Sequence, residues 1–328
     1  MVLTKRLCRL ACGLMMLAGP AWAGGWPAPD VDALPHDAFG RTVRAGRDLI
    51  DHTAALIGPD APDPARRFSG NGLACASCHL DGGTKKFALP LVGVWGVYPR
   101  FIGREDEVRT LAERINGCME RSMNGRPLPV GGPEMKAMLT YIRFVSAGFP
   151  TGIVADGHGA PKLKLPDAGS DPAHGARVYA ATCASCHQPD GQGLKLPASD
   201  AARQGQRYLF PPLWGPDSYN DGAGMARPIT AAEFIRANMP RGTDYAHPVL
   251  GVQDAFDVAV FINSQKRPHL AGTERDFPDR ALKPADATYP PFIGPFPPAQ
   301  HSFGPWRPIR QWQKANAGRL GDAGNAAR

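Results

Sequence analysis

The pattern Cys-x-x-Cys-His occurs twice in the sequence and offers its clearest chemistry. Both copies read Cys-Ala-Ser-Cys-His, at residues 75–79 and 183–187. The pattern is typical of covalent haem c attachment, in which two thiols form thioethers to the porphyrin and the histidine binds the iron. One match alone also suits a zinc site or a redox dithiol, but two matches, each after a predicted helix, indicate two haems. The predicted attachment residues are Cys75, Cys78, Cys183 and Cys186, and the predicted iron ligands are His79 (haem 1) and His187 (haem 2).

Cys118 has no partner in this scheme. Of the seven cysteines, four belong to the two motifs and two lie in the N-terminal segment, which we interpret below as a leader peptide. An exported protein seldom keeps one odd thiol without a reason. Cys118 lies in the stretch GREDEVRTLAERINGCMERSMNG, with Arg104, Arg114 and Arg121 around it. Guanidinium groups beside a thiol stabilise its thiolate.

The same stretch indicates an anion site. If it is helical, Arg114, Cys118 and Ser122 follow at i, i+4 and i+8 and share one face. Guanidinium groups bind oxyanions in a forked geometry, so a small anionic sulfur compound would be held beside a sulfur atom. Any one arginine alone would be explained by surface ion pairs with the neighbouring glutamates, but the group around a free thiol favours function. Asn116-Gly117 is expected to break or cap this helix just before the cysteine.

The sequence leaves alternatives for the sixth ligand of each iron. For haem 2 the first candidate is Met239, on a loop just ahead of the last predicted helix of that region, and Met225 in a glycine-rich loop is its competitor. For haem 1, Cys118, Met119 and Met123 all lie near the expected place. The unpaired thiol puts Cys118 slightly ahead, and a thiolate ligand would lower the potential of the iron.

Composition limits the class of protein. The chain has 328 residues, enough for about two domains, and its abundant glycine and proline predict short helices and long loops rather than a large sheet. Residues 1–23 have a basic start, an apolar core and an Ala-Trp-Ala end, which predict a signal peptide cleaved after Ala23 and export to the periplasm. No later stretch reaches transmembrane length. The net charge of +7 comes without a basic run, so nucleic acid is not an expected partner.

The predicted helices form a tandem arrangement around the two motifs. A helical pattern at 37–58 precedes the first motif and another at 133–148 follows it; patterns at 171–182, 230–238 and 253–265 repeat this order around the second motif. We therefore divide the chain into a first haem domain at 24–155, a linker at 156–170 and a second haem domain at 171–268. Residues 269–328 are predicted to form a proline-rich extended arm lying on both domains, with a disordered end.

Two segments carry a resemblance to a known family. Residues 75–129, above all RINGCMERSMNG, and the later segment FPPLWGPDSYNDGAGMARPITAAEFIRANMPRG resemble the dihaem c-type thiosulfate dehydrogenases, also called tetrathionate synthases. The resemblance implies a mainly α fold with two tandem class-I-type cytochrome c domains. It also implies that His79 and Cys118 ligate the iron of haem 1, that His187 and Met239 ligate the iron of haem 2, and that Arg104, Arg114 and Ser122 hold thiosulfate. Some members carry a lysine before the methionine; Asn238 stands there here, so no lysine–methionine exchange of ligands is expected.

The implied reaction joins two thiosulfates into tetrathionate, and its reverse is tetrathionate reduction. In the oxidising direction the electrons leave through haem 2 to an external carrier, such as a soluble or membrane-bound cytochrome c. In our hypothesis Cys118 leaves the iron and reacts with one thiosulfate, and the second thiosulfate then attacks that sulfur. The alternatives are a non-catalytic dihaem electron-transfer subunit of a periplasmic dehydrogenase and a component of a sulfur-oxidising complex. In the first of these Cys118 has no catalytic role.

Overall fold

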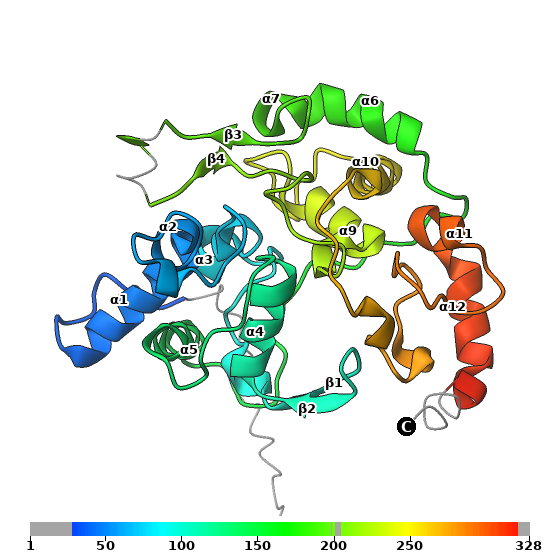
Figure 1. Ribbon diagram of the computed structural model, residues 1–328. Coiled ribbons are helices and arrows are strands. Elements are labelled where there is room, and N and C mark those ends of the chain that lie inside the picture. Colours follow the sequence, from blue (N-terminus) through cyan, green and yellow to red (C-terminus); the bar gives the residue numbers. More distant parts are fainter. Residues whose placement is uncertain (1–27, 198, 201–204, 321–328) are drawn as a thin grey trace, which may run out of the picture.

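The computed structural model describes residues 28–197, 199–200 and 205–320. The predicted signal peptide lies outside the described residues. The chain forms two mainly helical domains that lie side by side, and a C-terminal arm that runs along both of them (Figure 1). Within the described ranges no helix is both long and apolar enough to cross a membrane.

The first domain surrounds the first Cys-Ala-Ser-Cys-His motif. Its helices and strands are α1 (Ala38–Asp51), α2 (Thr53–Ile57), η1 (Pro64–Arg66), η2 (Cys75–Ser77), α3 (Leu80–Gly83), η3 (Trp95–Val97), β1 (Arg100–Ile102), β2 (Glu107–Arg109), α4 (Leu111–Arg121) and α5 (Pro133–Val145). The strands β1 and β2 pair antiparallel as a small hairpin that leads into α4. Helices α1 and α5 pack against each other, and their apolar faces meet in one core.

The second domain repeats this plan around the second motif. Its elements are α6 (Pro172–Thr182), α7 (Ala184–His187), β3 (Leu194–Lys195), β4 (Tyr208–Phe210), η4 (Gly224–Ala226), α9 (Pro228–Asn238) and α10 (Val252–Ser264). Helix α6 packs against α10, and α10 against α9. The first helix of each domain begins in the same way, because the side chains of Asp37 and Asp171 accept hydrogen bonds from backbone N–H groups of the first turn.

A glycine sits at the helix crossing in both domains. A Cβ atom on Gly46 of α1 would lie 2.1 Å from the carbonyl oxygen of Ala137, and one on Gly175 of α6 would lie 1.9 Å from that of Asp257. Neither distance is possible for real atoms, so the backbones approach as closely as they do because no side chain stands between them. The first and last helices of each domain are thereby held together over the haem-attachment motif.

Two expectations about helices need correction. The predicted helix at 37–58 is interrupted at His52, and the interruption lets the Thr53 hydroxyl accept a hydrogen bond from the backbone N–H of Cys75, at 3.0 Å. Asn116-Gly117 does not break α4. Instead the Asn116 side chain forms two hydrogen bonds with the backbone of Leu128, at 2.9 and 2.8 Å, which satisfy it without disturbing the helix.

The C-terminal arm is more helical than the extended arm expected. It contains η5 (Thr273–Arg275), η6 (Arg280–Leu282), α11 (Pro298–Phe303) and α12 (Trp306–Ala315). Trp306 is fully buried in the core of the second domain, where its ring lies 5.6 Å from that of Phe256. Nearer its start the arm passes the β1–β2 hairpin and α4 of the first domain (Figure 1). There Asp276 of the arm forms an ion pair with Arg121 of α4. The expected disorder falls at the chain end, and residues 321–328 lie outside the described residues.

Polar contacts hold the two domains together. Arg207 of the second domain forms ion pairs with Asp60 of the first and with Asp217 of its own domain. The backbone N–H of Gly72 donates to Asp217 Oδ1 at 2.8 Å. A third contact joins α9 to the loop after the first motif: the Asn238 side-chain amide donates to the carbonyl oxygen of Phe87 at 3.1 Å. The two attachment motifs are therefore fixed relative to each other.

Candidate active site

The predicted proximal histidines are both oriented by a backbone carbonyl. His79 Nδ1 is hydrogen-bonded to the carbonyl oxygen of Leu89, and His187 Nδ1 to that of Pro211 at 2.8 Å. A bond of this kind fixes the tautomer and leaves Nε2 available as a ligand. Burial lowers the pKa of both imidazoles, which favours the neutral form that binds iron.

The four motif cysteines form no disulfide bond within the described residues, so all four could form thioethers. Burial raises the pKa of the Cys75 thiol to about 11 and that of the Cys78 thiol to about 12. Among the described residues no cluster of three histidine, cysteine or carboxylate side chains is placed to hold a metal ion. The zinc-site alternative is therefore not supported by the geometry, whereas paired thiols beside an oriented histidine fit haem attachment.

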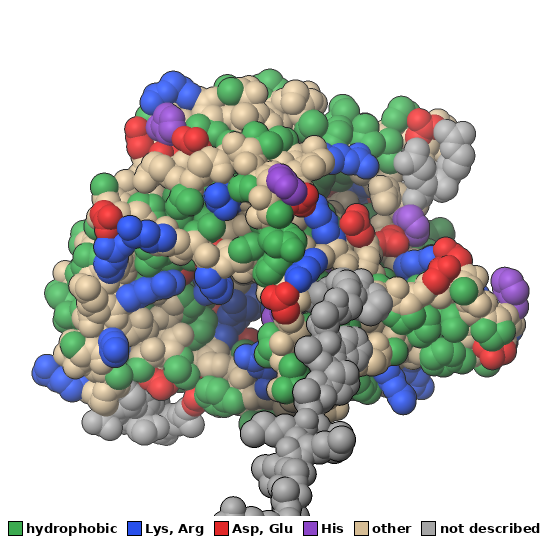
Figure 2. Space-filling model, turned by 180° about the vertical axis from the view of Figure 1, so that it is seen from behind, with side chains coloured by type: hydrophobic (Ala, Val, Ile, Leu, Met, Phe, Trp, Pro, Cys, Tyr) green, Lys and Arg blue, Asp and Glu red, His purple; other side chains and the backbone are tan. Residues whose placement is uncertain are grey.

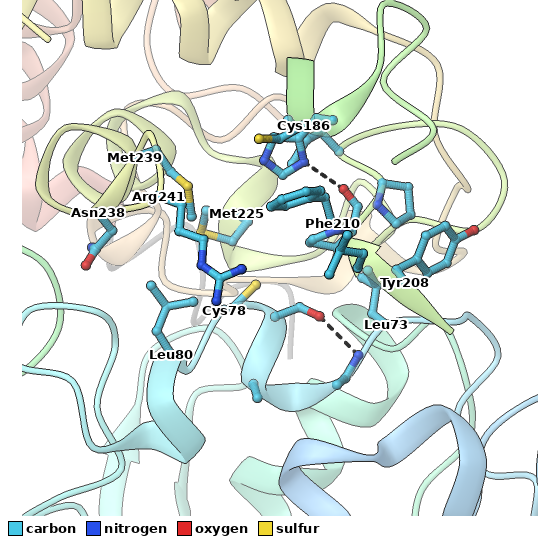
Figure 3. Close-up of a pocket in the computed structure, with 18 of the residues that line it drawn as sticks. Leu73, Cys78, Leu80, Cys186, Tyr208, Phe210, Met225, Asn238, Met239 and Arg241 are labelled. Carbon is cyan, nitrogen blue, oxygen red and sulfur yellow. Dashed lines mark hydrogen bonds between the residues drawn. The ribbon is translucent and has the colours of Figure 1, made fainter. Parts of the chain in front are cut away.

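A cavity of about 540 Å³ opens between the two domains. Cys78 of the first motif and Cys186 and His187 of the second line it. Figure 3 shows Cys78 and Cys186 on opposite sides of this space, with the side chains of Met225 and Met239 at it. Both candidate sixth ligands of haem 2 are thus brought to the cavity.

A second, smaller cavity brings together the residues predicted around haem 1. It is lined by Cys75, Cys78, His79, Cys118 and Ser122, together with Leu73, Ala74, Met123, Tyr219 and Met225. Cys118 and His79 therefore border one space, as an axial pair requires. Of the competing ligands, Met119 is buried in the core and does not line this cavity, whereas Met123 does.

The start of α4 positions Arg114 and Cys118. Thr110 caps the helix, since its hydroxyl accepts from the N–H of Glu113 while the Glu113 carboxylate accepts from the Thr110 N–H at 2.7 Å. One turn further along, Arg114 Nη1 donates to Cys118 Sγ at 3.4 Å. The charge of Cys118 is the main cause that raises the pKa of Arg114, with Tyr98 adding to it.

The other two arginines of the stretch differ in their partners. Arg121 forms a two-pronged ion pair with Asp276 of the arm, at 2.6 and 2.8 Å. Arg104 keeps a buried Nε without a hydrogen-bond partner among the described residues. Burial lowers the pKa of Arg104, and the nearby charges of Arg121 and Arg114 lower it further. The three guanidinium groups therefore lie in one neighbourhood, but within the described residues only Arg121 is neutralised by a direct ion pair.

Sequence reasoning missed the residues that complete this neighbourhood from elsewhere in the chain. Tyr98 lies near Arg114: burial raises the pKa of the Tyr98 hydroxyl, and the charge of Arg114 opposes that rise. Asp276 and Phe277 reach the arginines from the arm, more than 150 residues later. Nothing local in the sequence marks Asp276 and Phe277, because their role depends on how the arm is laid across the first domain.

The fold and the motif geometry define a cytochrome c with two tandem class I domains. Residues 66–151 match the family model described as SoxA/TsdA, cytochrome c domain, and residues 172–266 match the model described as cytochrome c. The chain is 42% identical over 263 residues to a thiosulfate dehydrogenase of Allochromatium vinosum, a match that covers 79% of this chain and 90% of that protein. It is 39% identical over 240 residues to one of Stutzerimonas stutzeri, covering 73% and 72%.

A solved structure agrees with these matches. The thiosulfate dehydrogenase TsdBA of Marichromatium purpuratum, in its as-isolated form, is 40% identical and superimposes with a TM-score of 0.66. That match covers 75% of this chain and 50% of the other, so this chain spans half the length of that relative. The chain belongs to the thiosulfate dehydrogenase family.

Proposed function

We propose that this chain is a periplasmic enzyme that oxidises two thiosulfates to tetrathionate in the first domain and passes the electrons out through the second. The observation that carries the proposal is that Cys118 and His79 line one small cavity, and that Arg114 donates a hydrogen bond to the Cys118 sulfur. A cysteine placed among arginines in this way suits a reaction between sulfur anions.

Each domain has residues suited to one haem c. Cys75 and Cys78 would attach the first haem, with His79 and Cys118 as its iron ligands. The second would be held by Cys183, Cys186, His187 and Met239. When bound, each haem accepts one electron. The paired, half-buried cysteines and the carbonyl-oriented histidines described above support both assignments.

The arginines have an electrostatic task. Two thiosulfate dianions repel each other, and Arg104 and Arg114 would offset that repulsion by charge-assisted hydrogen bonds. Ser122 lines the same cavity as Cys118 and would donate its hydroxyl to a bound oxyanion. Figure 2 shows lysine and arginine side chains gathered around a hollow near the middle of the rear face, an arrangement that would attract anionic substrates.

Cys118 would act as the sulfur nucleophile. Its thiolate and the terminal sulfur of one thiosulfate form a sulfur–sulfur bond with loss of two electrons, which gives a cysteine S-thiosulfonate. The terminal sulfur of the second thiosulfate attacks the sulfur bonded to Cys118, releases the Cys118 thiolate and forms tetrathionate. The exchange step is reversible, so the same residues would also serve tetrathionate reduction.

The electrons would leave through the second domain. Cys78 and Cys186 line one cavity, so the two attachment motifs are close enough for transfer between their cofactors (Figure 3). The last acceptor would be an external soluble or membrane-bound cytochrome c or a similar carrier. The alternative, a non-catalytic electron-transfer subunit, predicts that the purified chain alone is not reduced by thiosulfate.

Rapid mixing of the purified, oxidised protein with thiosulfate tests the proposal. We expect both haems to be reduced without any partner protein and tetrathionate to accumulate when an external acceptor is added. Cys118→Gly should keep both haems and lose this turnover, whereas Glu120→Gln, at an exposed position of the same helix, should behave as the parent. Unchanged turnover in Cys118→Gly would overturn the proposed mechanism.

A further inference from the structure

The arm makes a buried ion pair beside the candidate active site. Asp276 Oδ2 and Oδ1 accept from Arg121 Nη1 and Nη2, at 2.8 and 2.6 Å. The side chains are only 13% and 7% exposed, and the Tyr289 hydroxyl donates to the same carboxylate at 2.7 Å. A two-pronged pair that is shielded from water is not readily exchanged for another anion. Asp276 therefore neutralises the charge of Arg121 and leaves that guanidinium group unavailable to another anion.

The next residue of the arm, Phe277, contacts Arg104 without neutralising its charge. The backbone N–H of Phe277 donates to the carbonyl oxygen of Arg104 at 2.7 Å, and its ring centre lies 5.8 Å from the guanidinium carbon. The ring supports the flat guanidinium group without supplying a counter-charge. The Arg104 Nε stays buried and without a hydrogen-bond partner among the described residues.

The arm itself is fastened on both sides of this contact. Arg280 Nη1 donates to the carbonyl of Asp276 at 2.6 Å. Further on, Lys283 is buried and its ammonium group donates to the carbonyls of Tyr289 and Pro291, at 3.0 and 2.9 Å. These contacts fix the place of Asp276 and Phe277 independently of any bound anion.

The charges around the thiol then divide into two kinds. Arg104 and Arg114 have no carboxylate bound directly to them in the described part of the chain, whereas Arg121 does. Glu105 is the other carboxylate whose charge acts on Arg114 and Arg121. Two guanidinium groups without a direct carboxylate partner leave positive charge for a thiosulfate dianion. A third would hold anions more tightly, including the dianionic product.

We propose that Asp276 and Phe277 are positioning residues of the anion site, by which the arm sets its charge and so its affinity for small sulfur oxyanions. Asp276 withdraws Arg121 from the site, and Phe277 supports the Arg104 guanidinium without neutralising it. The inference rests on the proposed function for the identity of the substrate. The arrangement of charges itself is independent of turnover.

The test measures anion binding apart from catalysis. Sulfate is an unreactive dianion, so its dissociation constant can be measured by calorimetric titration of the oxidised, haem-loaded protein. We expect Asp276→Asn to bind sulfate about fivefold more tightly, because Arg121 gains freedom to meet the anion. The same variant should show a lower KM for thiosulfate together with a lower kcat, since the dianionic product is retained. Damage to the structure alone would weaken binding rather than tighten it.

Phe277 gives a second and opposite test. Phe277→Leu should bind sulfate about fivefold more weakly, because Arg104 loses its support, and Phe277→Tyr should restore the affinity of the parent. Glu274→Gln is the matched control: it removes a carboxylate two residues from Asp276 that pairs only on the surface, with Arg275, and should change the affinity less than twofold.

The outcomes separate the two proposals. Sulfate affinity that is unchanged or weaker in a folded Asp276→Asn variant would overturn the inference. If that variant does not fold, parent-like affinity in Phe277→Leu would overturn it. A parent protein that binds sulfate with these responses but does not oxidise thiosulfate would keep the inference about the anion site and contradict the proposed function.

Discussion

Arg114 and Cys118 lie one helical turn apart in α4, with Arg114 Nη1 3.4 Å from Cys118 Sγ. The pair joins an anion-binding group to a sulfur atom on a rigid element that is capped at its start and tied to Leu128 by Asn116 near its middle. The helix therefore fixes the backbone positions from which the two side chains meet. The proposed chemistry therefore depends on the position of α4.

Replacing Arg114 tests its share in catalysis. Arg114→Gln should lower kcat/KM for thiosulfate about 100-fold, as expected when one charged donor to the reacting anions is lost. Arg114→Lys should lower it about tenfold, because the charge remains and the fork is lost. Arg143→Gln, at an exposed position of α5, is the control and should leave steady-state kinetics unchanged. Equal losses in Arg114→Gln and Arg143→Gln, with no loss in Arg114→Lys, would contradict a specific role of Arg114 and mean that only the total charge matters.

The two methionines at the larger cavity can be told apart. Met239→Leu should abolish the near-infrared absorption band that marks methionine bound to ferric haem, and should lower the potential of that haem. Met225→Leu should keep the band, although its side chain lines both cavities. The opposite pattern would assign Met225 as the ligand. Absorption spectra of the oxidised variants suffice for the measurement.

The glycines at the helix crossings should not tolerate a side chain. Gly46→Ala and Gly175→Ala should each lower the free energy of unfolding by about 1–3 kcal/mol, because the added methyl group must push the paired helix away. Gly131→Ala is the control, since a Cβ there meets no atom within 4 Å. Chemical denaturation measures all three. Parent-like stability in the first two variants would contradict the close approach.

Asn116 should stabilise the loop that follows α4. Asn116→Ala removes two hydrogen bonds to Leu128 and should cost about 1–2 kcal/mol of unfolding free energy. Asn116→Asp keeps the acceptor oxygen for the Leu128 N–H and should lose less. A ranking in which the aspartate variant is no better than the alanine variant would show that the Leu128 N–H bond contributes little. Urea titrations of the three proteins provide the comparison.

The parts of the fold that could be predicted are those that depend on residues close together in the sequence. The two Cys-Ala-Ser-Cys-His motifs and the amphipathic helices around them predicted the tandem organisation. The spacing of Arg114 and Cys118 predicted their common helix, at whose C-terminal end Ser122 is the cap residue. The break at His52 could not be foreseen, because it is favoured by a contact between Thr53 and Cys75 across the domain.

The parts of the site that escaped prediction depend on distant segments. Local propensity predicted a break at Asn116-Gly117, and a tertiary contact with Leu128 satisfies the asparagine instead. In the sequence Arg121 looked equivalent to Arg104 and Arg114, yet its charge is neutralised by an ion pair with Asp276. The arm residues that make this difference follow α4 by more than 150 positions, so no pattern within the stretch could reveal them.

The central claim is that the sulfur of Cys118 is the iron ligand opposite His79. Electron paramagnetic resonance of the oxidised, haem-loaded protein tests it most directly. We predict one low-spin signal typical of histidine–thiolate ligation, lost in Cys118→Ala, and a separate histidine–methionine signal that persists in that variant. Two histidine–methionine signals in the parent, both unchanged in Cys118→Ala, would contradict the claim and leave a two-centre electron carrier.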